Sequence, residues 1–511
     1  MSSDSIIILV AIIVYMAGMI LIGFLVKDKN KTSSDYFLGG RSLGPLVTAM
    51  SAEASDMSGW LLMGLPGLAL MTGIAEAFWT ALGLAIGTYL NWLFVAKRLR
   101  TYTEKIDAFT IPEYFSKRFG GSKALTCIAA IIIVVFFVPY TASGFASCGK
   151  LFSTLFGMNY MTAMIISAIV IIIYCTLGGF LAASTTDFVQ SIVMTIALVV
   201  VVGFGAVKSG GFSAVIDNVS GLDGFLDVFK GFDVASESTS SYGALPVAST
   251  LAWGLGYFGM PHILLRFMGI ENKEKLKLSR RVASIWVVIS MGIAVVIGVV
   301  GYSLMKGGIV QAYADSSASE TIIVDIAKVI AKYGAIPAFV GGIILAGILA
   351  STMSTADSQL LAAASSISQN LLVETFGIKI SNKAQLWLAR ISVVIISILG
   401  IFLARDPSSS VFRIVSFAWA GFGAAFGPLV LLSLFWKKTT AAGGIAGVVA
   451  GGAMVFIWKF VIRVQFAGSV LDIYELLPAF IVGLIAIVVV SLLTKNKPGV
   501  EETFEQVANN A

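Results

Sequence analysis

The residues of this sequence that could do chemistry are polar side chains inside long apolar stretches. Asp56 follows Pro45 by about 16 Å of helix at 1.5 Å per residue, which would place its carboxylate near the middle of a bilayer. An acid at that depth is costly and usually functional, and it would lie near a cation. The alternative is a helix that starts late and leaves Glu53 and Asp56 at the membrane surface.

A run of hydroxyl side chains occupies residues 347–358. Ser351, Ser354 and Thr355 stand at positions i, i+3 and i+4, so they share one helix face. A hard monovalent ion such as sodium prefers oxygen ligands. Together with backbone carbonyls freed near Asp56, these hydroxyls could bind sodium. The same run taken alone is more typical of close packing between helices.

Two apolar stretches are interrupted by Gly, Ser or Pro, at residues 50–60 and 253–262. Interrupted helices at membrane depth are tolerated where they are buried or line a cavity, and a pair of them indicates a substrate site between inverted repeats. Backbone N–H groups at Ser58 and Gly59 could bind a substrate carboxylate. Pro261 would keep the second interruption open, because it removes a backbone donor.

Aromatic residues could form the apolar wall of such a site: Tyr140, Trp253 and Tyr257. Each of them taken singly is more typical of ordinary packing. The single histidine, His262, is more typical of polar packing than of a proton relay. Residues 254–259 match G-x-G-x-x-G, but no strand precedes them, so a dinucleotide site is not expected.

The composition places the whole chain in a membrane. Of its 511 residues, 58% are hydrophobic and 12% are charged, about half the charged fraction of soluble domains. Basic residues form no continuous face, which excludes a nucleic-acid partner. With one histidine and no metal spacing among Cys127, Cys148 and Cys175, we expect no cofactor and no metal other than sodium.

The apolar stretches predict about thirteen transmembrane helices in a single all-α domain over residues 1–495, followed by a short cytoplasmic tail at 496–511. The first is expected to be a retained span rather than a signal peptide, because no basic segment precedes it. Their limits are 6–26, 46–72, 74–96, 124–146, 160–183, 187–207, 246–268, 281–305, 335–363, 386–404, 411–435, 440–462 and 472–494.

Basic residues gather in the loops after the first, third, seventh, eleventh and last spans, among them Lys27, Lys29, Lys31, Arg98, Arg100, Lys273, Arg281, Lys437 and Lys495. These loops lie on one side of the membrane, which the positive-inside rule makes the cytoplasm. The N-terminus is then outside and the C-terminus inside. The two interrupted spans begin the predicted inverted repeats, at residues 46–207 and 246–435. The loop at 208–245 is predicted to be a partly structured outer cap.

The chain resembles the solute:sodium symporter family along its whole length. Four passages carry the resemblance: residues 35–44, 54–66, 253–262 and 418–428. The resemblance implies a leucine-transporter-like fold of inverted five-helix repeats in a bacterial plasma membrane. It also implies sodium-coupled import of L-proline by alternating access, with no obligate protein partner.

The resemblance also assigns roles to residues. It implies that sodium binds backbone oxygens of Ala54, Met57 and Ser351 and hydroxyls of Ser354 and Thr355, with Asp56 as the essential acid nearby. Arg41 and Asp187 are implied to influence coupling. Proline would lie against Ser58, Gly59, Trp60, Tyr140, Trp253, Tyr257 and Pro261.

Other functions stay open at this point. The chain could be a sodium symporter for another small solute, or a proton-coupled amino acid permease. A membrane-embedded enzyme would need a catalytic constellation, such as paired acids on facing spans, and the sequence shows none. A channel would not need the pair of interrupted helices.

Overall fold

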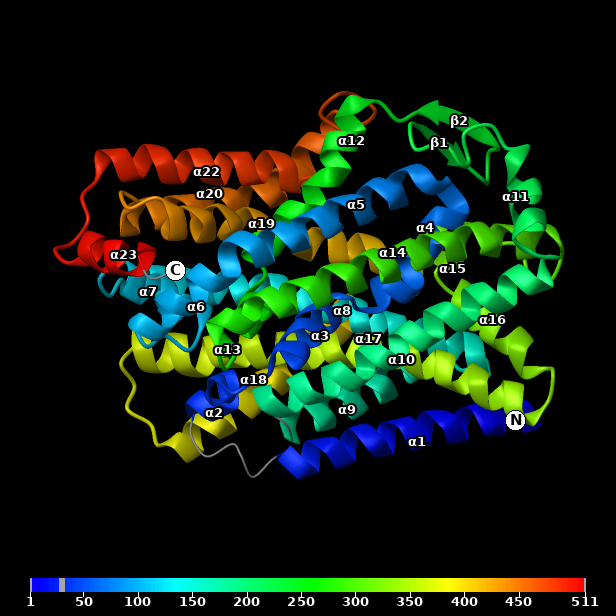
Figure 1. The fold of residues 1–511 in the computed structure, drawn as a ribbon, viewed down its shortest axis with the longest axis horizontal. Coiled ribbons are helices and arrows are strands. Elements are labelled where there is room, and N and C mark those ends of the chain that lie inside the picture. The colour runs from blue at the N-terminus through cyan, green and yellow to red at the C-terminus, as the bar shows by residue number, and fades with distance from the viewer. Residues whose placement is uncertain (1, 27–32, 178, 510–511) are drawn as a thin grey trace.

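The computed structural model describes residues 2–26, 33–177 and 179–509, and it is a bundle of helices (Figure 1). Ten helices in these ranges are long and apolar enough to cross a membrane. The helix at Tyr160–Thr176 is apolar but shorter, and two further spans are broken. Each of the thirteen predicted spans therefore contains helix.

The unbroken spans are single helices or helices extended by a π-helical turn. Helix α8 ends at Phe156, well beyond the predicted limit of residue 146, because residues 147–151, including the polar Ser147 and Lys150, are buried in the bundle. The bounds are α1 (Ser3–Val26), α5 (Ile74–Leu90), α8 (Lys123–Phe156), α9 (Tyr160–Leu177), α10 (Phe180–Lys208), α14 (Leu276–Lys306), α17 (Ala335–Ser365), α18 (Asn382–Leu403), α19 (Val411–Phe435), α20 (Ala441–Ile457) and α22 (Leu476–Leu493).

Both predicted interruptions are present. The second span consists of α3 (Pro45–Asp56), a non-helical step, a π-helical turn at Trp60–Gly64, and α4 (Leu65–Thr72). The seventh consists of α12 (Ala244–Leu251), a 3-10 segment at Ala252–Gly259, and α13 (Pro261–Gly269). Met260 is extended, with φ −78° and ψ 108°, and Pro261 starts the new helix in the position where its missing N–H costs nothing.

The two ends of the bundle differ (Figure 1). The hairpin end carries α11 (Phe212–Ser220), the antiparallel strands β1 (Lys230–Asp233) and β2 (Ser238–Ser241), α15 (Ser316–Ser319) and α16 (Ile322–Ala331). The predicted cap at 208–245 is thus partly structured. The tail end carries α2 (Ser33–Leu38), α6 (Ala96–Lys105), α7 (Ile111–Arg118) and α23 (Val500–Ala508).

The predicted polar tail contains a docked helix. Phe504 and Val507 of α23 are buried, and the guanidinium of Arg118 lies 5.0 Å from the Phe504 ring centre. The sequence analysis did not predict this amphipathic helix, because the acidic residues of its exposed face made the whole segment look polar. The basic residues Lys27, Lys29 and Lys31 lie outside the described residues.

The glycine pattern at 254–259 is explained by close helix contacts. A Cβ on Gly254 would collide with the backbone of α5 at Gly83, one on Gly256 with the Trp419 indole, and one on Gly259 with the backbone of Phe422. The motif therefore packs the broken span against α5 and α19.

We predict that Gly256→Ala lowers the stability of the protein by about 1–3 kcal/mol, because the added methyl group must displace Trp419. Thermal unfolding in detergent measures the effect. The matched control is Gly292→Ala in α14, where an added Cβ meets nothing within 4 Å. Equal melting temperatures for the two variants would contradict this account of the motif.

Candidate functional site

At the break in the second span, backbone groups lose their helical hydrogen-bond partners, and nearby side chains replace these partners. The carbonyl oxygen of Asp56 accepts hydrogen bonds from the Ser58 N–H (2.9 Å), the Trp60 indole N–H (3.1 Å) and the Tyr140 hydroxyl (3.0 Å). The Ser58 N–H is therefore engaged here rather than free for a carboxylate. Gly59 lies against Ser147 of α8 with no room for a Cβ, which holds the break close to α8.

The Asp56 carboxylate is fully buried and points toward the aromatic residues. Its Oδ2 accepts a 2.6 Å hydrogen bond from the Tyr257 hydroxyl, and Oδ1 lies 3.5 Å from the Tyr140 hydroxyl. Sequence reasoning placed Asp56 near sodium and the two tyrosines on the substrate wall. The structure joins these three residues into one cluster, so the acid lies on the predicted substrate side of the break.

Trp253 is the centre of an aromatic layer beside this cluster. Its ring centre lies 6.2 Å from Trp60, 5.2 Å from Phe412 and 5.1 Å from Tyr474. The Trp419 indole N–H donates to the Trp253 carbonyl, which anchors the 3-10 segment on α19. Every predicted aromatic wall residue is therefore buried in one region.

The predicted sodium ligands meet where α3 ends against the middle of α17. The Ser354 hydroxyl lies 2.7 Å from the Ala54 carbonyl and 3.1 Å from the Ser351 carbonyl, which places two predicted backbone ligands around one hydroxyl. Among the described residues, the buried Thr355 hydroxyl has no hydrogen-bond partner. An oxygen left without a partner in the interior suits a cation, which would coordinate it.

Met57 stands at the same break. Its N–H donates to the Glu53 carbonyl as the last helical bond of α3, and its backbone then leaves the helix at φ −80° and ψ 76°. The Met57 carbonyl is thereby released from the α3 ladder, as a backbone ligand for sodium requires.

A buried ionic network lies one helical turn from Ser354. Asp187 of α10 pairs with Arg266 of α13 at 3.0 Å and accepts a 2.6 Å hydrogen bond from Ser51 of α3. Arg266 also donates to Ser358, whose hydroxyl lies 2.8 Å from the Ser354 carbonyl. Asp187 is thus connected through Arg266 and Ser358 to the predicted sodium ligands.

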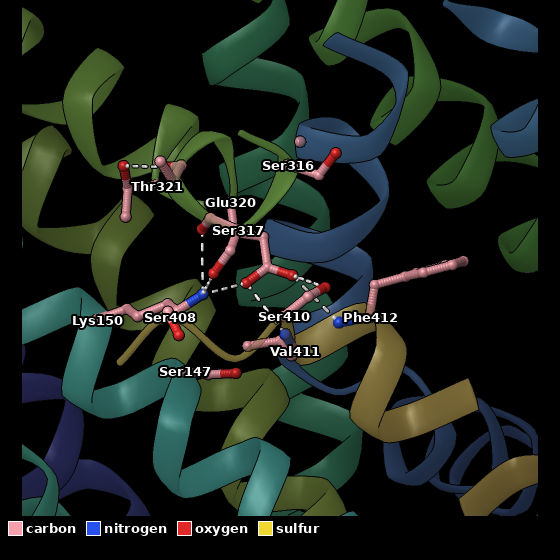
Figure 2. A network of polar contacts seen from close by, with 12 residues as sticks. Ser147, Lys150, Ser316, Ser317, Glu320, Thr321, Ser408, Ser410, Val411 and Phe412 are labelled. Carbon is pink, nitrogen blue, oxygen red and sulfur yellow. Dashed lines mark hydrogen bonds and ion pairs between the residues drawn. The ribbon is translucent and has the colours of Figure 1, made fainter. Parts of the chain in front are cut away.

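A second buried ion pair ties the hairpin end together (Figure 2). Lys150 of α8 lies 2.6 Å from Glu320, between α15 and α16, and both side chains are almost fully buried. Glu320 also accepts from the Ser410 hydroxyl and the N–H groups of Val411 and Phe412 at the start of α19. One carboxylate therefore joins α8, the α15–α16 segment and α19.

Arg41 performs a similar role at the tail end. Its guanidinium donates to the carbonyls of Met268, Thr103 and Ala108, at 2.8–3.0 Å, which joins α13 to the end of α6. Burial lowers the pKa of Arg41 to about 10, so the group remains charged at neutral pH. Arg41 thus holds the segment after α2 against α13 and α6, and its influence on coupling stays a prediction.

Several buried polar residues were given no functional role by sequence reasoning. Glu53 is 1% exposed and accepts from the Trp92 indole, one turn before Asp56 on the same helix. Arg266, Lys150 and Glu320 were given no role from the sequence. Glu53 could have been found, because an acid at i−3 from Asp56 shares its helix face. The partners of the other three become visible only in three dimensions.

His262 is fully buried and packs against the rings of Phe137 and Tyr140, at 5.6 and 6.2 Å between ring centres. It lies one residue after the break in the seventh span. The packing role of this histidine stays a prediction.

Known proteins resemble this chain in sequence and in shape. The model of the "Sodium:solute symporter family" matches residues 36–451. A "Sodium/proline symporter" of Haemophilus influenzae is 43% identical, over 96% of this chain and 95% of the relative. A protein of the same name in Escherichia coli is 40% identical over 95% and 93%, and the "Osmoregulated proline transporter OpuE" of Bacillus subtilis is 41% identical over 96% of each chain.

Two solved structures show the fold. A sodium-coupled sialic acid symporter matches with a TM-score of 0.77 at 18% identity, over 96% of this chain and 99% of that one. The transporter MhsT, solved with L-phenylalanine, matches with a TM-score of 0.54 at 14% identity, over 88% and 98%. The predicted leucine-transporter-like fold is confirmed by these likenesses.

We predict that Ser354→Ala weakens sodium binding about tenfold or more, because one oxygen ligand is lost where Ala54 meets α17. Sodium-dependent thermal stabilisation of the purified protein measures this affinity. Ser365→Ala is the matched control, since that buried hydroxyl of the same helix bonds only to its own helix carbonyl at Ala362. The ligand assignment fails if both variants keep the parent affinity.

We predict that replacing one member of the buried Asp187–Arg266 pair lowers the stability of the protein more than replacing both members. Asp187→Asn or Arg266→Gln alone leaves a charged partner buried, at a cost of about 3–5 kcal/mol, whereas the double variant should recover part of that loss. A double-mutant cycle on thermal stability in detergent tests this coupling. Additive losses would mean that the two groups do not act as a pair.

Proposed function

The chain belongs to the sodium:solute symporter family, and we propose that it imports L-proline together with sodium across a bacterial plasma membrane. The observation that carries this proposal is the near full-length identity of about 40% to proteins named sodium/proline symporter and proline transporter. The geometry of the break supports it, because the site combines oxygen ligands on one side with a buried acid and aromatic rings on the other.

The hairpin end faces outward in this proposal and the tail end faces the cytoplasm. The N-terminus is then outside and the C-terminus inside. The basic residues of the tail end, including Arg98, Arg100 and Lys437, support this orientation through the positive-inside rule.

The substrate lies between the two broken spans, against Ser58, Gly59, Trp60, Tyr140, Trp253, Tyr257 and Pro261. The ammonium group of proline binds near the Asp56 carboxylate, which Tyr140 and Tyr257 orient. The pyrrolidine ring packs on the buried aromatic residues. Because the Asp56 carboxylate contacts both tyrosines, replacing Asp56 would remove its negative charge and would also change the shape of the pocket.

Sodium couples to proline through the break itself. An ion held by Ala54, Met57, Ser351, Ser354 and Thr355 fixes the end of α3 against α17, and Asp56, between Ala54 and Met57, is the last residue of α3. Ordering this end for sodium also orders Asp56 for the substrate. By linkage each ligand then raises the affinity of the other by the same factor.

The driving force is sufficient for concentrative uptake. Moving one charge inward at about −100 mV releases roughly 2.3 kcal/mol. A tenfold sodium gradient adds about 1.4 kcal/mol. With one sodium per proline, together they support an accumulation on the order of several hundredfold.

Uptake of labelled proline into proteoliposomes tests the function. We expect accumulation with an inward sodium gradient, its collapse with a sodium ionophore, and no uptake when a proton gradient replaces sodium. Uptake driven by pH alone would instead identify a proton-coupled permease. Stabilisation by sodium without proline uptake would indicate a sodium symporter for another solute.

We predict that Asp56→Ala abolishes transport while the protein still reaches the membrane, because it removes the carboxylate that accepts from Tyr257 and lies 3.5 Å from the Tyr140 hydroxyl. Asp56→Asn keeps the size of the side chain and isolates the charge. Asp223→Asn, on an exposed loop of the hairpin end, is the control. Near-normal uptake by the Asp56→Ala variant would remove this residue from the mechanism.

A further inference from the structure

A groove faces the membrane between the end of α9 and the first half of α18. Its volume is about 460 Å³, and it is lined by Thr176, Trp387, Arg390, Ile391, Val394 and Ile395. Trp387, Ile391 and Ile395 are each at least half exposed, although they belong to a helix that is long and apolar enough to cross a membrane. Exposed apolar side chains on such a helix contact lipid when the protein is in a bilayer.

The groove lies at the tail end of both helices. Thr176 is the second-last residue of α9, and Arg390 stands in the third turn of α18. Because these two residues line the same groove, Arg390 lies near the level at which α9 ends. A long basic side chain near a helix end can pack its stem on apolar residues and place its charge at the membrane surface. The groove thus runs from the level of the lipid headgroups along α18 into the bilayer.

Arg390 has no acidic partner in the part of the chain that the structure describes. Its guanidinium lies 5.4 Å from the Trp387 ring centre, and within the described ranges it takes part in no hydrogen bond or ion pair. A cation on a membrane helix is costly, and such residues almost always pair with another group. The five N–H donors of a guanidinium match the oxygens of a phosphate group. The charge of Arg390 is therefore complementary to an anion from outside the chain.

A second cation stands on the same face of α18. Lys383 precedes Trp387 by four residues and Arg390 by seven, which is the spacing of neighbours on one helix face. Lys383 is exposed, and among the described residues it too has no hydrogen bond or ion pair. Tryptophan is typical of the membrane surface. The face therefore presents two cations around an indole and then an apolar stripe, an order that fits an anionic headgroup followed by an acyl chain.

We propose that this groove binds an anionic phospholipid. Arg390 and Lys383 bind its phosphate, and one acyl chain lies along Ile391, Val394 and Ile395. The bound lipid braces α9 against α18, two helices that contact each other. The class of lipid rests on the groove alone, whereas its place in the inner leaflet rests on the orientation given under the proposed function.

Native mass spectrometry of the purified protein with added phospholipid tests this site. We expect the parent to retain dioleoyl phosphatidylglycerol about tenfold more tightly than the zwitterionic dioleoyl phosphatidylcholine. Arg390→Gln should weaken phosphatidylglycerol binding about tenfold and Lys383→Gln about fivefold, with phosphatidylcholine binding unchanged. Arg390→Lys keeps the charge and should lose less affinity than Arg390→Gln.

Arg405→Gln is the matched control. Arg405 is exposed just beyond the opposite end of α18, and its guanidinium lies 4.6 Å from the Phe402 ring centre. The variant removes the same charge from a similar aromatic contact outside the groove. Equal losses for Arg405→Gln and Arg390→Gln, or equal retention of the two lipids by the parent, would overturn the site.

The same spectra distinguish other occupants of this face. Displacement of phosphatidylglycerol by inorganic phosphate would indicate a site for free phosphate, which needs no acyl chain. A dimer that is present in the parent and lost in Arg390→Gln would assign the face to a second copy of the chain. Either result overturns the lipid site.

Photocrosslinking locates the lipid on the unmodified chain, so it does not depend on the folding of a variant. Phosphatidylglycerol with a diazirine in its acyl chain should label residues 387–395 and the end of α9 in membrane vesicles. Label spread evenly over the lipid-facing helices would contradict a specific site.

These measurements require neither sodium nor proline. Selective lipid binding by a parent protein that takes up no proline supports the groove and contradicts the proposed function. Proline uptake by a protein without lipid selectivity contradicts the groove and leaves the proposed function intact. The two proposals therefore fail by different results.

Discussion

The rest of the structure depends on the broken backbone of the second span between Asp56 and Gly59. A buried carbonyl without a hydrogen bond costs on the order of 1–3 kcal/mol, so neighbouring helices must supply donors. Tyr140 of α8 and the Trp60 indole bond to the Asp56 carbonyl, and Ser354 of α17 bonds to that of Ala54. The need to satisfy the break thus fixes the positions of α8 and α17.

The broken backbone also places the groups that could bind a cation next to those that could bind a substrate. Two buried acids, Glu53 and Asp56, lie at the end of α3, and the buried base Arg266 pairs with Asp187 rather than with either of them. The oxygens of α3 and α17 beside these acids can coordinate a cation. The two ends of the bundle are held together by different contacts, by Lys150 and Glu320 at the hairpin end and by Arg41 at the tail end.

Sequence alone predicted the features that depend on local pattern. The thirteen spans, both interruptions and the shared face of Ser351, Ser354 and Thr355 follow from hydropathy and helical spacing. It could not predict which helices meet, so the Arg266–Asp187 pair was missed and Asp56 was expected beside the ion rather than bonded to Tyr257. Likewise, the docking of α23 depends on a surface formed by Arg118 and its neighbours, which no local pattern reveals.

The central claim is that one structural element, the break, serves both ligands. Its most direct test is reciprocal binding on the purified protein: proline affinity with and without sodium, and sodium affinity with and without proline. The account predicts that each ligand strengthens the other by the same factor, and that Ser354→Ala reduces both effects together. Proline affinity that does not change with sodium would contradict it.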